Sequence, residues 1–326
     1  MLKKNLYNLC NYIYFPYLKL DSLPKISHFT DNTTLSQLQS KIDFKLQWNK
    51  KNNFIINDFN LSFKYKILEQ TSNLLKIKLS IENSFILNPS ENNIQSKIID
   101  DYIIIAEYSF YESIKIYNLI SKEEYPHIYY DLIKKDLNTI NNFLPLSVDN
   151  LWNSKIELIN SMYDKLQHLS YHFSKSKVNR NSSFNIEKAC TYAETFALTS
   201  NPEYFSYDNI GGDCTNFASQ ILHAGGLSTN SVWKPYSNAW LRVEELYSYL
   251  MNNKLAYKTT YAKFSRGTLI QFNTPKLGHF FHTGFITHEL SNGEYLYCCH
   301  SYNKLNYPLS QIYPVLYPEI RGVNFY

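Results

Sequence analysis

The chain carries the stretch Gly211-Gly212-Asp213-Cys214-Thr215-Asn216-Phe217-Ala218-Ser219-Gln220-Ile221-Leu222-His223-Ala224-Gly225-Gly226, with one cysteine between a glycine turn and an amphipathic run. Apolar residues recur in this run at nearly helical spacing, and a glycine pair ends it. We therefore predict a helix that begins at or near Cys214. Unpaired backbone N–H groups and the helix dipole favour negative charge at such a start. The position predicts a lowered thiol pKa and a thiolate nucleophile.

A second interpretation of Cys214 is structural, since an isolated cysteine is more often a small buried hydrophobic residue than a reactive one. The flanking residues favour the chemical role. A core position does not need Gly-Gly-Asp in front of it, and four of the nine glycines in the chain bracket this segment.

Length and composition are those of a globular protein. The 326 residues are enough for two domains, and 44% of them are hydrophobic and 18% charged. The net charge is +4, without a long run of lysine or arginine, so we expect no nucleic-acid partner. No stretch of about 18 apolar residues occurs, so we expect no membrane span. Nothing in the composition fixes an oligomeric state.

The first residues, 1–14, make a poor secretory signal. Asparagines interrupt the apolar run, and no small-residue cleavage site follows it. We expect no Sec signal peptide, which leaves a cytoplasmic location and release or export by a non-Sec route as alternatives.

The five cysteines do not form a disulfide or zinc pattern, because their number is odd and no C-x-x-C pair occurs. A set of histidines and cysteines near the C-terminus offers side chains that can bind zinc, so a metal site is an alternative. It is disfavoured because no pair has a familiar ligand spacing. We therefore expect no metal and no cofactor. The set is His279, His282, His288, Cys298, Cys299 and His300.

Periodicity divides the chain into three parts. Residues 42–120 alternate between apolar and polar positions, which is typical of half-buried strands, and 102–106 is an apolar, more buried strand. An apolar stripe at helical spacing follows over residues 151–169. We predict a strand-rich accessory domain over 1–127, a helical linker region over 128–177, with the boundary in Lys175–Ser183, and a C-terminal domain over 178–326.

The C-terminal part is expected to combine helices with strands. Asn185 is a predicted cap of one helix, and another is expected over 239–252. Strands are expected over 268–272, 282–288 and 294–300. The fold class is therefore α+β, with the cysteine-bearing helix on an antiparallel sheet.

A cysteine nucleophile needs a group that takes and returns a proton, and histidine suits this task. His282 begins one predicted strand and His300 ends the next. If the two strands pair in antiparallel fashion, His282 and His300 approach each other as a base and its orienting partner. His223 is nine residues beyond Cys214 on the same helix, roughly 13 Å away along the axis, so we expect it to be structural. His279 and His288 are expected to be surface or loop residues.

The motifs of the C-terminal part resemble the bacterial "Putative amidase domain" family, which is similar to the NlpC-type and CHAP cysteine peptidases of cell-wall turnover within the papain-like group. The resemblance covers about residues 178–310. The chain departs from the family pattern at Thr268, where aspartate is usual. The matching residues are Asn179-Arg180, Ala189, Tyr192-Ala193, Asn201-Pro202, Tyr204, the stretch 211–226, Gly267 to Phe272, His282-Thr283, His300 and Tyr307-Pro308-Leu309.

The resemblance implies a papain-like C-terminal domain with Cys214 as the nucleophile and His282 as the base. His300 matches the third polar position, for which Asn303 competes. Asp213 is expected to fix the turn before the nucleophile. The backbone N–H of Cys214 is a natural oxyanion donor at a helix start. Asn216 and Gln220 are candidates to assist it.

Three functions follow as hypotheses. The first is a cysteine-dependent hydrolase of amide bonds, for which the resemblance implies peptidoglycan peptides as substrate and a strand-rich N-terminal domain that positions the enzyme or binds the wall. The second uses the same site for acyl transfer, transamidation or modification of a protein. The third is a non-catalytic wall-binding module, against which the joint presence of Cys214, His282 and His300 argues.

Overall fold

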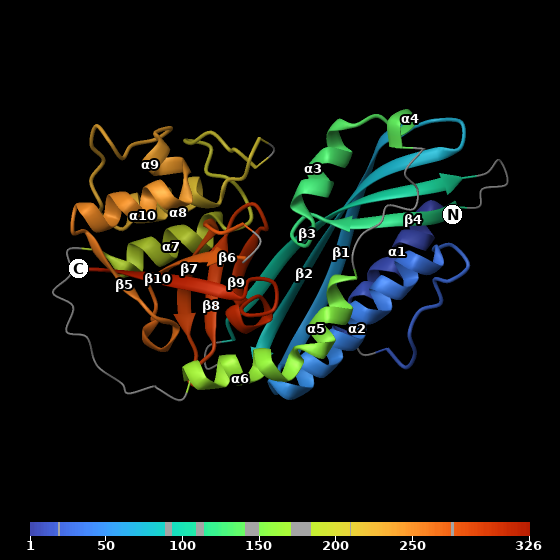
Figure 1. The fold of residues 1–326 in the computed structure, drawn as a ribbon, viewed down its shortest axis with the longest axis horizontal. Coiled ribbons are helices and arrows are strands. Elements are labelled where there is room, and N and C mark those ends of the chain that lie inside the picture. Colours follow the sequence, from blue (N-terminus) through green and yellow to red (C-terminus); the bar gives the residue numbers. More distant parts are fainter. Residues whose placement is uncertain are drawn as a thin grey trace. The chain divides into compact units, whose positions relative to one another are not determined.

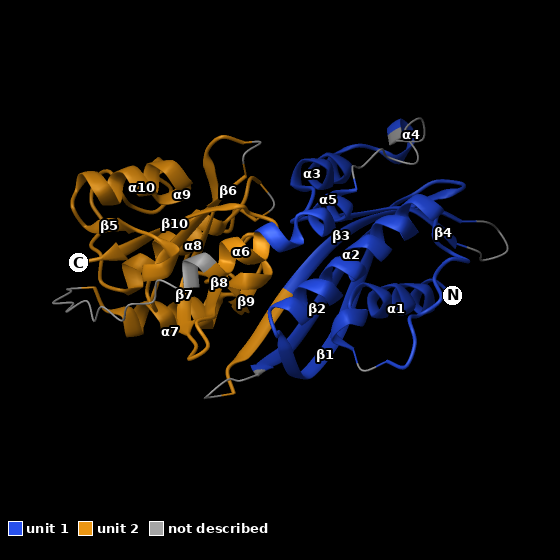
Figure 2. Cartoon of the chain, turned by 60° about the horizontal axis from the view of Figure 1, so that its bottom comes forward, with its two compact units in different colours: residues 1–88, 99–161 blue, residues 89–98, 162–326 orange. Residues whose placement is uncertain are grey.

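The computed structural model describes residues 1–18, 20–88, 93–108, 114–140, 150–170, 184–208, 210–274 and 277–326 (Figure 1). It is α+β, with several helices and antiparallel strand pairs throughout its sheet. The chain forms two compact units (Figure 2). Unit 1 comprises Met1–Asn88 and Ile99–Ser161, and unit 2 comprises Pro89–Ile98 and Met162–Tyr326. The expected linker, 128–177, is thus shared between the units, and its boundary at 175–183 lies outside the described residues.

Unit 1 is a four-stranded antiparallel sheet with helices on both faces. The strands follow the order β1-β2-β3-β4. The elements are α1 (Leu2–Ile13), the 3-10 helix η1 (Phe15–Tyr17), α2 (Asn32–Lys51), β1 (Ile55–Gln70), β2 (Leu74–Asn88), β3 (Gln95–Tyr108), β4 (Ile114–Ser121), α3 (Pro126–Lys134), α4 (Leu137–Ile140) and α5 (Leu151–Glu157). Helix α6 (Ile159–Ser170) begins in unit 1 and continues in unit 2.

The alternation in the sequence correctly predicts how this sheet is buried. Leu75, Ile77, Leu79 and Ile81 of β2 are buried against α1 and α2, as expected for one face of a strand. The predicted buried strand, 102–106, lies in β3 and packs on both faces. Its even-numbered residues join the core under α1 and α2, and its odd-numbered ones meet α3.

The sequence interpretation misses both N-terminal helices, and residues 42–51 are helical where strands were expected. Ile42 and Phe44 are two residues apart and imitate the period of a strand. In the structure Phe44 stacks on Trp48 at 5.9 Å, four residues later on the same face of α2. Asp31 caps the start of this helix through the N–H of Thr33.

Unit 2 carries the cysteine segment. Its strand order is β9-β8-β7-β6-β10-β5, all in antiparallel pairs, and the first residues of β3 pair with β9. The elements are α7 (Ile186–Phe196), α8 (Cys214–Ala224), α9 (Asn238–Leu241), α10 (Val243–Asn252), β5 (Ala256–Thr259), η3 (Tyr261–Lys263), β6 (Leu269–Asn273), β7 (Phe280–Glu289), β8 (Tyr295–Cys299), β9 (Lys304–Pro308), η4 (Leu309–Gln311) and β10 (Glu319–Phe325).

Helices α7, α8 and α10 gather on one face of this sheet (Figure 1). Phe217 and Leu222 of α8 are buried with Phe285 of β7 and Cys298 of β8 in one hydrophobic core. The predicted cap of α7 is confirmed, because the side chain of Asn185 accepts the N–H of Lys188. The expected helix over 239–252 occurs as α9 and α10. The three expected strands correspond to β6, β7 and β8 within two residues at each end. Among the described residues, no helix combines the length and hydropathy that crossing a bilayer requires.

Candidate active site

Cys214 is the first residue of α8, as the sequence predicts. Its side chain is buried, with 8% exposed, and its sulfur lies 3.8 Å from the hydroxyl of Thr215. That hydroxyl is 3.3 Å from the hydroxyl of Thr283 on β7, and both threonines are buried. The sulfur is thus held between the start of a helix and the strand that carries His282.

The expected lowering of the thiol pKa is wrong for this structure. Burial raises the pKa of Cys214 above its ordinary value of 9.0. Hydrogen bonds from Thr215 and from the backbone of Thr283 act in the opposite direction but do not outweigh burial. The sulfur is therefore a neutral thiol at pH 7. The cost of burying a thiolate away from water exceeds the stabilisation that the N-terminus of α8 would give to its charge.

Asp213 makes several hydrogen bonds at the turn before Cys214. Its Oδ1 accepts the N–H of Tyr207 and the side-chain amide of Asn216, both at 2.8 Å. Its Oδ2 lies 2.7 Å from Nδ1 of His300, and its own N–H donates to Oγ of Ser301 at 2.7 Å. The carboxylate is almost fully buried, and each oxygen has at least one partner.

His282 lies on β7 with a buried ring and an aromatic environment. The ring is 5.0 to 5.9 Å, centre to centre, from Tyr302, Phe272 and Tyr317. Its Nε2 is buried and has no hydrogen-bond partner among the described residues. Burial, together with the charge of Lys304, lowers the pKa of His282 from 6.5 to about 3. The ring is neutral at pH 7.

His300 follows β8 and lies in a different environment. Nδ1 is paired with Asp213, Nε2 is 2.7 Å from the carbonyl oxygen of Phe196, and the ring stacks on Phe217 at 3.8 Å. The rings of His282 and His300 make no hydrogen bond or ring contact with each other in the described part of the chain.

Strand register explains this separation. The predicted antiparallel pairing of β7 and β8 is correct, with Phe285 opposite Cys298. Both of these side chains belong to the core under α8, so Thr283, two residues before Phe285, faces the helix as well. His282 directly precedes Thr283 in the strand, so its side chain points to the other face of the sheet.

Two of the remaining predicted residues, Asn216 and Gln220, have structural partners. The amide of Asn216 donates to the carbonyl of Phe205 and to Asp213, and its oxygen accepts from Trp240. Both donors of Asn216 are therefore used. Oε1 of Gln220 accepts the hydroxyl of Tyr192 at 2.8 Å. Asn303 lies in the turn between β8 and β9.

The other histidines of the C-terminal part lie away from Cys214. His223 is exposed, near the end of α8, with Nδ1 3.0 Å from the carbonyl of Leu227. His279 is an exposed loop residue. His288 is half-buried, and its Nε2 is 2.7 Å from Glu194. No group of three or more His, Cys, Asp or Glu side chains within the described ranges has the arrangement of a metal site.

Sequence reasoning missed three residues around Cys214, namely Thr215, Thr283 and Ser301. The sequence could have indicated Thr215 and Thr283, because each is a hydroxyl residue directly beside a predicted catalytic residue. Ser301 could not be found from the pattern. Its contact with Asp213 is made from the turn after β8, where Ser301 has a positive φ of 72°.

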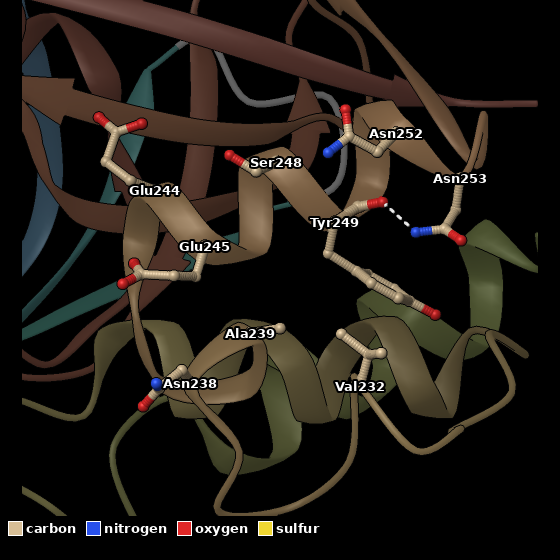
Figure 3. Close-up of a pocket in the computed structure, with 9 residues that line it drawn as sticks. All are labelled: Val232, Asn238, Ala239, Glu244, Glu245, Ser248, Tyr249, Asn252 and Asn253. Carbon is tan, nitrogen blue, oxygen red and sulfur yellow. Dashed lines mark hydrogen bonds between the residues drawn. The ribbon is translucent and has the colours of Figure 1, made fainter.

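A surface groove of about 440 Å³ lies elsewhere in unit 2, between α10 and the segment 232–239 (Figure 3). Val232, Ala239 and Tyr249 line it together with polar residues of α10, and Glu244 and Glu245 lie at one end. Cys214, His282 and His300 are not among its lining residues, so we do not assign the groove to the candidate active site.

Comparisons with known proteins find a family model that matches the region containing Cys214, and two similar proteins. Residues 183–319 match the family model described as "Putative amidase domain". The match suggests amide hydrolysis. Two proteins of Bacillus subtilis (strain 168), both named as uncharacterized, are similar. YjcM is 33% identical over 130 residues, 37% of this chain and 31% of YjcM. YhbB is 31% identical over 112 residues, 30% of this chain and 35% of YhbB.

The chain thus spans about a third of the length of each of these relatives. No solved structure matches the chain. The likeness to NlpC-type, CHAP and papain-like enzymes therefore stays a prediction.

Proposed function

We propose that the protein is a cysteine-dependent amide hydrolase in which Cys214 is the nucleophile and His282 the general base. One observation carries the proposal. Cys214 begins a helix inside the region that matches the amidase domain, and its sulfur rests against β7 at Thr283, the neighbour of His282.

His282 is a better candidate for the base than His300. A base must be neutral and must have a free nitrogen. His282 is neutral at pH 7, and its Nε2 has no partner within the described ranges. Both ring nitrogens of His300 are already paired. The ring of His282 lies on the other face of the sheet, among Phe272, Tyr302 and Tyr317, and makes no hydrogen bond to Cys214. The proposal therefore requires this ring to turn toward Cys214 when substrate binds, and catalytic pairs are often incomplete before that step.

The proposed reaction starts from a neutral pair. As the sulfur of Cys214 attacks the carbonyl carbon, its proton passes to His282, and the carbonyl oxygen becomes an oxyanion. The backbone N–H of Cys214, at the start of α8, is the proposed oxyanion donor. The protonated His282 then gives its proton to the leaving amine. Water, deprotonated by His282, then attacks the thioester carbonyl. The C–S bond breaks, the acid leaves, and His282 returns the proton to the sulfur of Cys214.

The substrate class is proposed in two steps. An amide bond follows from the description of the matching family. A peptide bond of peptidoglycan rests on the resemblance of the motifs around Cys214, His282 and His300 to cell-wall peptidases. A papain-like arrangement of the C-terminal domain belongs to the same proposal.

Digestion of purified peptidoglycan tests the function. We expect wild type to release peptide fragments that mass spectrometry identifies, and Cys214→Ala to release none. Cys190→Ala is the matched control, because Cys190 is a buried cysteine on the neighbouring helix α7. Release by Cys214→Ala would exclude the cysteine mechanism. Amine adducts formed by wild type with added amines would favour acyl transfer. Binding to the wall without cleavage would favour the non-catalytic module.

A further inference from the structure

Beyond the nucleophile and the base, we infer that His300 is a positioning residue that holds the turn before Cys214 through Asp213, and that it is not a third catalytic group beside His282. This inference rests on the proposed function, because it assigns a role within the same site. We call Asp213, His300 and Ser301 the nucleophile clamp.

The two nitrogens of His300 are both occupied by acceptors. Nε2 lies 2.7 Å from the carbonyl oxygen of Phe196, the last residue of α7. A carbonyl oxygen only accepts, so Nε2 donates its proton there. Nδ1 lies 2.7 Å from the carboxylate of Asp213. His300 therefore has no nitrogen left with which to orient His282.

The clamp joins the turn before Cys214 to the end of β8 at two points. The side chain of Asp213 pairs with His300, and its backbone N–H donates to Oγ of Ser301 at 2.7 Å. Gly212 permits this close approach, because a Cβ there would lie 3.2 Å from the same oxygen and its φ is +106°. The ring of His300 also stacks on Phe217, one turn into α8, at 3.8 Å with the planes 4° apart.

Both groups of the pair are buried, with 5% of the His300 side chain and 2% of the Asp213 side chain exposed. The hydrogen bond between them is charge-assisted, and such bonds are the stronger ones in proteins. Asp213 also holds the N–H of Tyr207 and the amide of Asn216. Loss of His300 therefore loosens the loop before Cys214 as well as the start of the helix.

The clamp predicts opposite effects on two reactions of Cys214. The wild-type sulfur is only slightly exposed, so loosening the turn should admit a small alkylating reagent more readily. The same loosening should slow amide cleavage, because cleavage needs fixed geometry. A residue that only oriented the base would slow cleavage without exposing the sulfur.

The test follows alkylation of Cys214 by iodoacetamide in the full chain, by mass spectrometry at pH 7. His300→Phe retains a ring for stacking and loses both donors. We expect alkylation to be roughly tenfold faster or more, the change that loss of one charge-assisted hydrogen bond produces. Asp213→Asn should give a similar increase, and the double variant should add little, because both substitutions break one contact.

Two further variants sharpen the result. His288→Phe is the matched control, because His288 forms a comparable pair with Glu194, at 2.7 Å, on β7. It should leave the alkylation of Cys214 unchanged. His300→Asn returns an amide donor near the position of Nδ1, so it should restore slow alkylation and part of the cleavage rate.

Unchanged alkylation in His300→Phe, with a wild-type circular dichroism spectrum, would overturn the inference, as would multiplicative effects of the two clamp substitutions. If His300→Phe does not fold, Ser301→Ala removes the second contact of Asp213 and should raise alkylation in the same direction. No increase in that variant would also overturn it. If wild type cleaves no amide, the proposed function fails while the alkylation result still decides the clamp.

Discussion

At the scale of single residues, the candidate site contains a neutral thiol and a neutral imidazole that make no hydrogen bond with each other. Burial raises the pKa of Cys214 and lowers that of His282 to about 3, so neither carries charge at pH 7 in the free protein. A thiolate–imidazolium pair that exists before substrate binds would need a lowered pKa at Cys214 and a raised pKa at His282. The proposed reaction therefore transfers the proton during attack on the substrate.

The lowered pKa of His282 predicts how stability depends on pH. Between pH 3 and 6.5 the unfolded chain binds a proton at His282 that the folded chain does not. The stability that neutral His282 contributes is complete above pH 6.5 and is lost as pH falls toward 3. We expect wild type to lose up to about 1.4 kcal/mol per pH unit more than His282→Gln over this range.

Urea unfolding of both proteins at several pH values measures this difference. Thr283→Val is the control, because it alters the same strand and leaves His282 in place. Parallel pH curves for wild type and His282→Gln would contradict the burial of a neutral imidazole.

The contact between the hydroxyls of Thr215 and Thr283 predicts that substitutions of the two residues have non-additive effects on the free energy of unfolding. Thr215→Val leaves the buried Thr283 hydroxyl without its partner, so we expect a loss of about 1–3 kcal/mol in the free energy of unfolding. Thr215→Val with Thr283→Val removes both polar groups and should cost less than either change alone. Denaturant unfolding of the four proteins decides this, and additive losses would argue against the pair.

At the scale of elements, the sequence predicts most of unit 2 because local patterns agree with tertiary contacts there. The glycine turn before Cys214, the cap at Asn185 and the apolar β6 to β8 are all readable from residue order. The second half of α2 is not, because Ile42 and Phe44 imitate the period of a strand.

The candidate site is less predictable than the elements that carry it. The sequence places His282 at the start of one strand and His300 at the end of the next; the antiparallel pairing of these strands is correct, whereas His300 lies one residue beyond β8. Whether their rings meet depends on which face each residue occupies, and a shift of one residue exchanges the faces. Only the observed register, with Phe285 opposite Cys298, decides that question.

The C-terminal end of α8 offers a test of its packing. A Cβ at Gly225 would lie 2.2 Å from the buried ring of Phe184, whereas one at Gly211 would meet nothing within 4 Å. We expect Gly225→Ala to lower the free energy of unfolding by about 1–3 kcal/mol through overpacking, and Gly211→Ala to have little effect. Equal losses in the two variants would show that α8 does not end against Phe184.

At the scale of the whole molecule, the two units have separate hydrophobic cores. Ile104 is buried in the core of unit 1 under α1 and α2, and Leu222 is buried in the core of unit 2 under α7 and α10. Chains with separate cores often depart from two-state unfolding. We expect two calorimetric transitions.

Substitutions in each core assign the transitions. Ile104→Ala should lower the temperature of one transition and Leu222→Ala that of the other, since each creates a cavity costing about 2–5 kcal/mol. A single transition that both variants lower equally would show that the units unfold as one.

The central claim is tested most directly by trapping the covalent intermediate. Wild type incubated with peptidoglycan fragments is quenched in acid, digested, and mapped by mass spectrometry. The account predicts a thioester adduct on the peptide that contains Cys214, and its absence in Cys214→Ala, with the other four cysteines unmodified. Cleavage of the substrate by Cys214→Ala, or an adduct on a different residue in wild type, would contradict it.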